Sequence, residues 1–283
     1  MKKARFFLIS SMVIFGTLGL FVRHIPVSSG ELALCRAVLA AILIGVYLLG
    51  SGSKIHFADI RKEVPLLLLS GISMGINWIF LFEAYKYTTV SIATLSYYFA
   101  PVLVTAVCPF LFREKLTKRQ LLCFCMSTLG VIMIIGVSSF EHSGTNLLGI
   151  LFGLGAAVFY AAVILLNKFI RNVTGIHRTF LQFIAAIIVL IPYVFMTSGL
   201  HLERLSGIGW MNLFIVGLFH TGITYCMYFS SLKELPGQEA AILSYIDPFV
   251  AVVVSVVFLG ESITAFQIVG GILILGFAIL NEK

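Results

Sequence analysis

Charged residues are scarce in this chain, and no long polar segment interrupts it. Only 11% of the 283 residues are charged, 60% are hydrophobic, and the mean hydropathy is +1.07. A soluble domain carries charge on about a quarter of its residues, so this composition excludes a soluble globular protein. The longest polar stretch, residues 51–63, is too short to enclose a core of its own. We therefore expect the chain to lie in a lipid bilayer.

Motifs for metals, nucleotides and disulfides are also missing. The five cysteines lie in apolar runs, and Cys123-x-Cys125 has neither zinc nor thioredoxin spacing. The six histidines are scattered, and no G-x4-GK[ST] motif occurs. We predict no metal, no cofactor and no ATP-driven pump. A membrane enzyme would need clustered His, Asp or Glu residues near an interface, and it stays only as a distant alternative.

Apolar runs long enough to cross a bilayer recur along the whole chain. A membrane-spanning helix needs about 20 apolar residues. A backbone in lipid must satisfy its own N–H and C=O groups, which favours helices. The predicted fold class is an all-α integral membrane protein with ten transmembrane helices. Their expected ranges are 6–24, 31–50, 64–85, 90–112, 120–138, 147–168, 176–198, 208–232, 237–259 and 262–280.

One segment of the chain recurs 147 positions later. FLFEAYKYTTVSIATLSYYFAP, residues 80–101, corresponds to MYFSSLKELPGQEAAILSYIDP, residues 227–248. At this fixed offset nine of the 41 positions from 80 to 120 are identical. The identities include Tyr98/Tyr245, Pro101/Pro248 and Glu114/Glu261. We predict two five-helix repeats, residues 1–140 and 141–283.

The two repeats are expected to be inverted relative to each other, because five spans is an odd number. The connection at residues 113–119 carries four cations, whereas the matched connection at 260–266 carries none. If the N terminus is cytoplasmic, fifteen of the nineteen cations lie on that side, as the positive-inside rule requires. The net charge of +7 therefore reports topology, and we expect no nucleic-acid partner. The predicted location is the cytoplasmic (inner) membrane, with both termini cytoplasmic.

These segments resemble the EamA-type ten-helix members of the drug/metabolite transporter superfamily. The resemblance covers nearly the whole chain. It rests on FEAYKYTTVSIATLSYYFAPVLV with FREKLT in the first half, ILSYIDPFVAVVVSVVFLGESIT in the second, and Arg36. Such members export amino acids, other metabolites or drugs, and some take solutes up. Asp247 precedes Pro248 where the family commonly has a glutamate, which shortens that side chain.

Pro101 and Pro248 are the candidate helix breaks and gating positions. Each removes a backbone hydrogen bond and crowds the preceding turn, so both helices should bend or open there. Inverted-repeat transporters place their substrate sites near the midplane, beside discontinuous helices in corresponding positions. The alternative for each proline is a packing kink without ligand contact.

Asp247 is the first candidate for binding the substrate or a coupling ion. A carboxylate within a membrane span usually marks an ion, proton or substrate pathway. A structural hydrogen bond to a serine or to the freed backbone is the alternative. Ser244, Asp247, Pro248 and Ala251 share one helical face, which we expect to line a cavity. Protons are a possible coupling ion.

The remaining binding candidates are polar or aromatic side chains within the predicted spans. They are Tyr97, Tyr98, Tyr245, Arg36, Asn77, Trp78 and His220. A tyrosine offers contact area and a polar group to a moderately apolar solute. Arg36 could bind a carboxylate, either that of Asp247 or one on the substrate, or its side chain could extend to the interface. Packing between helices is the alternative for the aromatic residues, and a satisfied core residue for His220.

The sequence as a whole predicts a secondary active transporter that works by alternating access. Its small-molecule substrate is expected to be an amino-acid-like or amphipathic metabolite, and the expected direction is export. An importer or an uncoupled facilitator is the alternative that the same architecture would permit.

Overall fold

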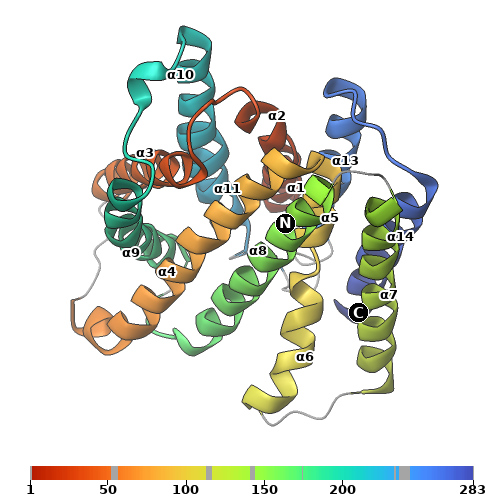
Figure 1. The fold of residues 1–283 in the computed structure, drawn as a ribbon. Helices are drawn as coiled ribbons and strands as arrows, with labels where there is room; N and C mark the ends of the chain where they lie inside the picture. The colour runs from red at the N-terminus through yellow and green to blue at the C-terminus, as the bar shows by residue number, and fades with distance from the viewer. Residues whose placement is uncertain are drawn as a thin grey trace.

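The structure of the protein is a computed structural model that describes residues 2–51, 57–112, 117–140, 144–173, 175–232, 234–235 and 243–282. Every regular element in these ranges is a helix, which confirms the all-α prediction (Figure 1). The elements are α1 (Lys2–Gly16), α2 (Leu18–Val22), α3 (Ser29–Gly50), α4 (Phe57–Tyr87), α5 (Val90–Tyr97), α6 (Ala100–Phe112), α7 (Lys118–Phe140), α8 (Gly144–Phe169), α9 (Gly175–Met196), η1 (Leu202–Arg204), α10 (Gly207–Phe214), η2 (Ile215–Ile223), α11 (Thr224–Leu232), α13 (Ile246–Phe258) and α14 (Ala265–Glu282).

Six of the described helical stretches are long and apolar enough to cross a membrane. They are Lys2–Val22, Ser29–Gly50, Arg61–Tyr87, Thr145–Phe169, Gly175–Met196 and Gly207–Ser231. Shorter apolar helices lie within the other four predicted ranges, at Val90–Val104, Leu121–Met133, Ile246–Phe258 and Ala265–Phe277. The count of ten membrane crossings stays a prediction.

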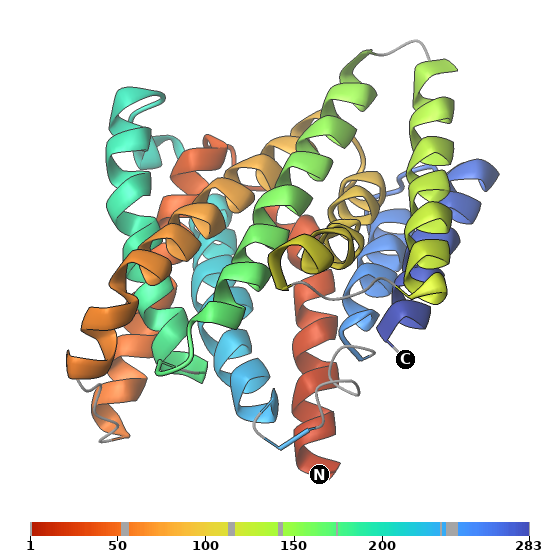
Figure 2. The same ribbon diagram turned by 90° about the horizontal axis from the view of Figure 1, so that it is seen from below.

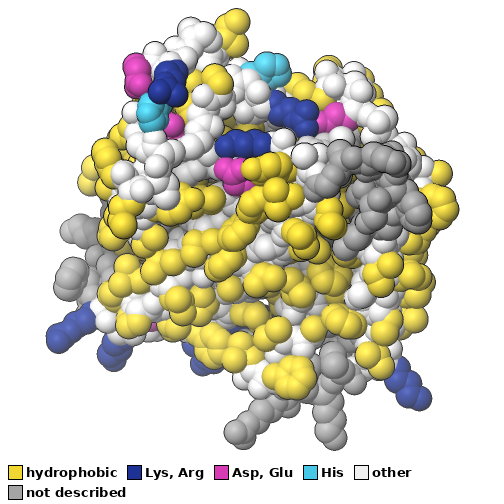
Figure 3. Space-filling view, viewed as in Figure 1, with side chains coloured by type: hydrophobic (Ala, Val, Ile, Leu, Met, Phe, Trp, Pro, Cys, Tyr) yellow, Lys and Arg dark blue, Asp and Glu magenta, His cyan; other side chains and the backbone are white. Residues whose placement is uncertain are grey.

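The surface of the molecule carries a broad apolar zone between two charged ends (Figure 3). Many large hydrophobic side chains are exposed in the structure, such as Leu49 at 84% and Phe110 at 86%. Exposed apolar area on this scale would be unstable in water, and it suits contact with lipid tails. The chain therefore folds as a multi-pass membrane protein.

The helices pack in pairs around the interior. α4 contacts α8 and α9, α3 contacts α9 and η2, and α7 contacts α14, as the two ribbon views agree (Figures 1 and 2). The main core cluster lies between α3, α4 and α9 and includes Ile44, Phe82 and Phe183. A Cβ added at Gly71 would lie 2.4 Å from the Cβ of Ala185 on α9. Glycine therefore lets these two helices approach closely.

Buried carboxylates satisfy backbone groups where helices end. The Glu63 side chain on α4 accepts hydrogen bonds from three consecutive N–H groups, those of residues 171–173, between α8 and α9. Glu31 on α3 accepts one from the N–H of His201, at 2.6 Å. Such N–H groups lack helical partners, and leaving them unpaired in the interior would be costly.

Replacing Glu63 with alanine should destabilise the fold. Three N–H groups would lose an ionised acceptor, and we expect the free energy of unfolding to fall by about 2–3 kcal/mol. The measurement is the thermal midpoint of the purified protein in detergent. Glu203→Ala is the matched control, because the Glu203 side chain is 68% exposed and its ion pair with Arg204 is long, at 4.0 Å. Equal midpoints for the two variants would contradict the assignment.

Candidate functional site

One helix break in each half of the chain lies at a position that the sequence repeat matches. α5 ends one residue before Tyr98, and α6 begins two residues after it. Pro101 has no N–H to donate and crowds the carbonyl four residues back, which accounts for a break there. In the second half the chain turns at Tyr245 immediately before α13, three residues ahead of Pro248. The backbone therefore turns at the repeat-matched tyrosine in both halves.

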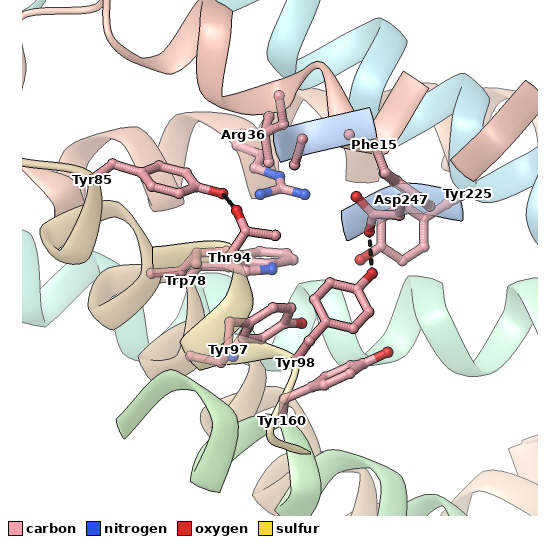
Figure 4. Close-up of a pocket in the computed structure, with 15 residues that line it drawn as sticks. Phe15, Arg36, Trp78, Tyr85, Thr94, Tyr97, Tyr98, Tyr160, Tyr225 and Asp247 are labelled. Carbon is pink, nitrogen blue, oxygen red and sulfur yellow. Dashed lines mark hydrogen bonds between the residues drawn. The ribbon is translucent and has the colours of Figure 1, made fainter. Parts of the chain in front are cut away.

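The two breaks lie against each other in the interior. α5 packs against α13, and the ring centroids of Tyr98 and Tyr245 are 6.3 Å apart. The Tyr98 hydroxyl donates a hydrogen bond to the carboxylate of Asp247, in the first turn of α13 (Figure 4). The Tyr98–Asp247 hydrogen bond thus joins the two interrupted helices, and it does so at the carboxylate that the sequence predicts to bind the substrate or a coupling ion.

A cavity of about 110 Å³, which we call the central chamber, opens beside this hydrogen bond (Figure 4). Residues from α1, α2, α3, α4, α5, α8, α11 and α13 surround it. Its lining residues are Phe15, Gly16, Leu18, Arg36, Asn77, Trp78, Leu81, Tyr85, Thr94, Tyr97, Tyr98, Tyr160, Tyr225, Asp247 and Ala251. Seven of these fifteen residues are aromatic, and the set includes one carboxylate and one guanidinium.

A second cavity of about 370 Å³, the inner chamber, continues from the central one. The two chambers share Phe15, Tyr98, Tyr160, Tyr225 and Asp247. The inner chamber extends to Arg178 in the first turn of α9 and also has Pro101, Ser244 and Tyr245 in its wall. Together the chambers reach the size of small-molecule sites, which is roughly 300–1,000 Å³.

Arg36 is buried in the wall of the central chamber and does not extend to the interface. Its side chain is 3% exposed, and Nε donates a 2.7 Å hydrogen bond to Oγ1 of Thr221. The guanidinium carbon lies 4.7 Å from the ring centroid of Trp78 and 5.5 Å from that of Phe82. No ion pair joins Arg36 to Asp247, although both line the chamber. The two opposite charges are thus available to a bound solute.

Three other predicted residues are either already bonded within the protein or lie outside the chambers. Asn77 lines the central chamber, but its Nδ2 already donates to the carbonyl of Ala156 at 2.7 Å. Pro248 is buried and lines neither chamber. His220 also lies outside both chambers, and its Nε2 is 2.9 Å from Oγ1 of Thr17, at the junction of α1 and α2.

Sequence reasoning missed several lining residues. Phe15, Tyr85 and Tyr228 face the chambers, and so does Arg178. Phe15 carries no signal because it is one of 25 phenylalanines. Tyr85 and Tyr228 carry a weak sequence signal, because tyrosines are common at membrane surfaces and less common within a span.

An ion pair links the two halves of the chain at the start of α5. Arg23, which follows α2, pairs with Glu261 between α13 and α14 at 2.7 Å and donates to the carbonyl of Thr88 at 2.9 Å. Glu261 accepts a 2.8 Å hydrogen bond from the N–H of Val90, the first residue of α5. These contacts tie the second half of the chain to the start of the broken helix in the first half. A third cavity of about 370 Å³, the vestibule, has Arg23 in its wall and shares Tyr85 with the central chamber.

Comparisons with known proteins identify the family of the chain. The sequence model of the EamA-like transporter family matches residues 2–136 and again 147–281. The uncharacterized transporter YxxF of Bacillus subtilis (strain 168) is 35% identical over 94% of this chain and 85% of its own. A probable amino-acid metabolite efflux pump of Salmonella typhimurium is 27% identical over 78% of each chain.

A solved crystal structure shares the fold. It superposes with a TM-score of 0.68 over 98% of this chain and 96% of its own, at 17% identity. The family and the names of these relatives point to transport rather than to enzymatic catalysis. With a helical membrane fold, an interior chamber and a family match over both halves, the chain belongs to the EamA-like transporter family.

Proposed function

We propose that this transporter is a secondary active exporter of a small amino-acid-like or amphipathic metabolite, and that it works by alternating access. The observation that carries the proposal is the central chamber itself. It lies where the broken helices of the two halves meet, and it presents Asp247 and Arg36 from walls of aromatic rings. A solute with an ammonium and an anionic group would find a partner for each, and its apolar part would contact the rings.

The packing of the helices supports a twofold repeat. A Cβ added at Gly75 would lie 3.4 Å from Leu190 on α9, and one at Gly222 would lie 2.7 Å from Leu43 on α3. The 147-residue offset relates both members of these two contacts. The family model also matches each half separately. We infer two repeats, residues 1–140 and 141–283, with five membrane helices each.

The positions of the connections support inversion of one repeat relative to the other. The end of α6 and the start of α7 lie at the bottom of Figure 1, whereas the matched end of α13 and start of α14 lie at its upper right. The first pair brackets residues 113–117, with the cations Lys118 and Arg119 following at the start of α7, and the second brackets residues 259–264. With the positive-inside rule, the first face is cytoplasmic, and the face with Arg23 and Glu261 is external.

We infer that the Arg23–Glu261 ion pair closes the central chamber on one face, because it joins the two halves beside the start of α5. The inner chamber extends from Asp247 to Arg178, and we infer that it leads to the other face. We infer that this conformation loads solute from the cytoplasm. We further infer that both termini are cytoplasmic and that the protein lies in the cytoplasmic membrane, as the excess of cations on one side suggests.

The proposed cargo and energy source follow from the chamber and from a relative. The name of the Salmonella typhimurium relative describes an amino-acid metabolite efflux pump. The chain has no Walker A motif, so we infer that an ion gradient drives transport. Asp247 is the proposed site at which a proton and the cationic group of the solute exchange.

Asp247→Asn should abolish coupled flux while leaving the fold intact. The Tyr98 hydroxyl can still donate to the amide oxygen, so the packing of α5 on α13 is kept. Without an ionisable group, pH-driven efflux from proteoliposomes should fall by at least about tenfold. The matched control is Glu203→Gln, an exposed acid far in sequence from the chamber. Undiminished pH-dependent flux in the Asp247 variant would remove this residue from the mechanism.

Single cysteines in a cysteine-free background should report opposite faces. Ser262→Cys should react with a membrane-impermeant maleimide added to intact cells, whereas Lys118→Cys should react only after the membrane is opened. The reason is that the two repeats enter the membrane from opposite sides. Labelling of both positions from one side would defeat the inverted topology.

Arg23→Gln should open the chamber to the external face. Loss of the ion pair with Glu261 and of the bond to the Thr88 carbonyl removes charge-assisted contacts that exist in the closed state. A reporter cysteine at Ala251 should then react with an externally added reagent about tenfold faster. Lys86→Gln is the control, since Lys86 pairs with Glu83 within one helix. An equal rate in both variants would show that the ion pair is not a closure.

A further inference from the structure

The helix that faces Arg36 is wound as a π-helix. η2 spans Ile215–Ile223, and the side chains of Thr221 and Thr224 donate to carbonyls five residues back, each at 2.8 Å. π-helical turns are rare, and they are frequent at functional sites. Thr221 and Thr224 are each 0% exposed, so their hydroxyls need partners within the protein.

The hydroxyl of Thr221 has a definite hydrogen-bond direction. Its proton goes to the carbonyl of Val216, so its lone pairs remain free to accept from Nε of Arg36 at 2.7 Å. Glycines allow η2 to lie this close to α3. A Cβ added at Gly217 would lie 2.4 Å from Leu39, on the same face of α3 as Arg36.

The rest of the guanidinium is directed to the chamber. Trp78 and Phe82 cover it with their rings, and its terminal nitrogens point into the cavity (Figure 4). Among the described residues, no carboxylate forms an ion pair with it. A buried cation without a counter-charge is costly in a membrane protein. The terminal N–H groups are therefore placed for an anionic group that arrives with a ligand.

We propose that Thr221 is the positioning residue for Arg36: the π-helical turn holds its hydroxyl so that the guanidinium presents its two terminal nitrogens to an anionic group in the central chamber. The inference rests on the proposed solute site in that chamber. It adds a residue outside the chamber wall that sets the preference for anionic groups. Thr224 provides the comparison, because its hydroxyl, at the start of α11, makes the same kind of bond to the carbonyl of Phe219 in η2.

Quenching of Trp78 fluorescence by an anion tests the positioning role of Thr221 without a transport assay. The chain has two tryptophans, and Trp210→Phe leaves Trp78 as the sole tryptophan, whose ring centroid is 4.7 Å from the Arg36 guanidinium carbon and whose emission is excited selectively at the red edge of its absorption. The probes are iodide, an anionic quencher, and acrylamide, a neutral one, applied to the purified protein in detergent. The ratio of their quenching constants measures attraction of an anion to Arg36, and acrylamide corrects for changes in access.

We expect Thr221→Val to lower the iodide-to-acrylamide ratio about threefold, because the guanidinium loses the bond that orients it. Thr221→Ser should restore the ratio, and Thr224→Val should leave it unchanged. If Thr221→Val does not fold, Thr221→Ala removes the same hydroxyl with less bulk. Circular dichroism and gel filtration verify the fold of each variant.

Two outcomes distinguish failure of the positioning role of Thr221 from failure of the proposed solute site. If Arg36→Gln lowers the ratio but Thr221→Val does not, or if Thr224→Val lowers it equally, the positioning role of Thr221 is wrong. If Arg36→Gln itself has no effect, the chamber attracts no anion through Arg36, and the proposed solute site fails with it.

Discussion

The meeting of two broken helices inside the protein is the constraint on which the rest of the structure depends. In lipid, backbone groups that lose their helical partners must be covered by other protein segments. The breaks at Tyr98 and Tyr245 fulfil this by facing each other across the interface of α5 and α13. The chambers open beside these breaks, and Asp247 is held there by Tyr98. The chambers therefore lie where the two helix breaks meet, close to Pro101 and Asp247.

The buried charges divide into two groups by their partners. Glu63 accepts three backbone N–H groups, and Glu261 accepts one together with an ion pair to Arg23. Such acids are fully engaged in holding connections between helices. Asp247 and Arg36 are instead each bonded to one neutral hydroxyl and face an open chamber. This difference in remaining hydrogen-bonding capacity is the reason for proposing Asp247 and Arg36, and not the other buried charges, as the groups that meet a ligand.

Much of this arrangement could be predicted from periodic and repeated features. Apolar runs located the helices, and the repeat identified Tyr98, Tyr245 and both prolines before any coordinates. Contacts between distant segments could not be predicted in this way. Nothing in the sequence pairs Arg23 with Glu261, and no local pattern distinguishes the π-helix of η2 from an α-helix. His220 was a reasonable candidate by depth, but its ring is directed to Thr17 and not to the chamber.

An experimental structure of the protein in a lipid nanodisc, determined with a mixture of amino acids present, tests the central claim most directly. We expect interrupted helices at Tyr98 and Tyr245 and solute density between Arg36 and Asp247. We also expect the connections after α6 and α13 on opposite membrane faces. Continuous helices through both tyrosines, or both connections on one face, would contradict it.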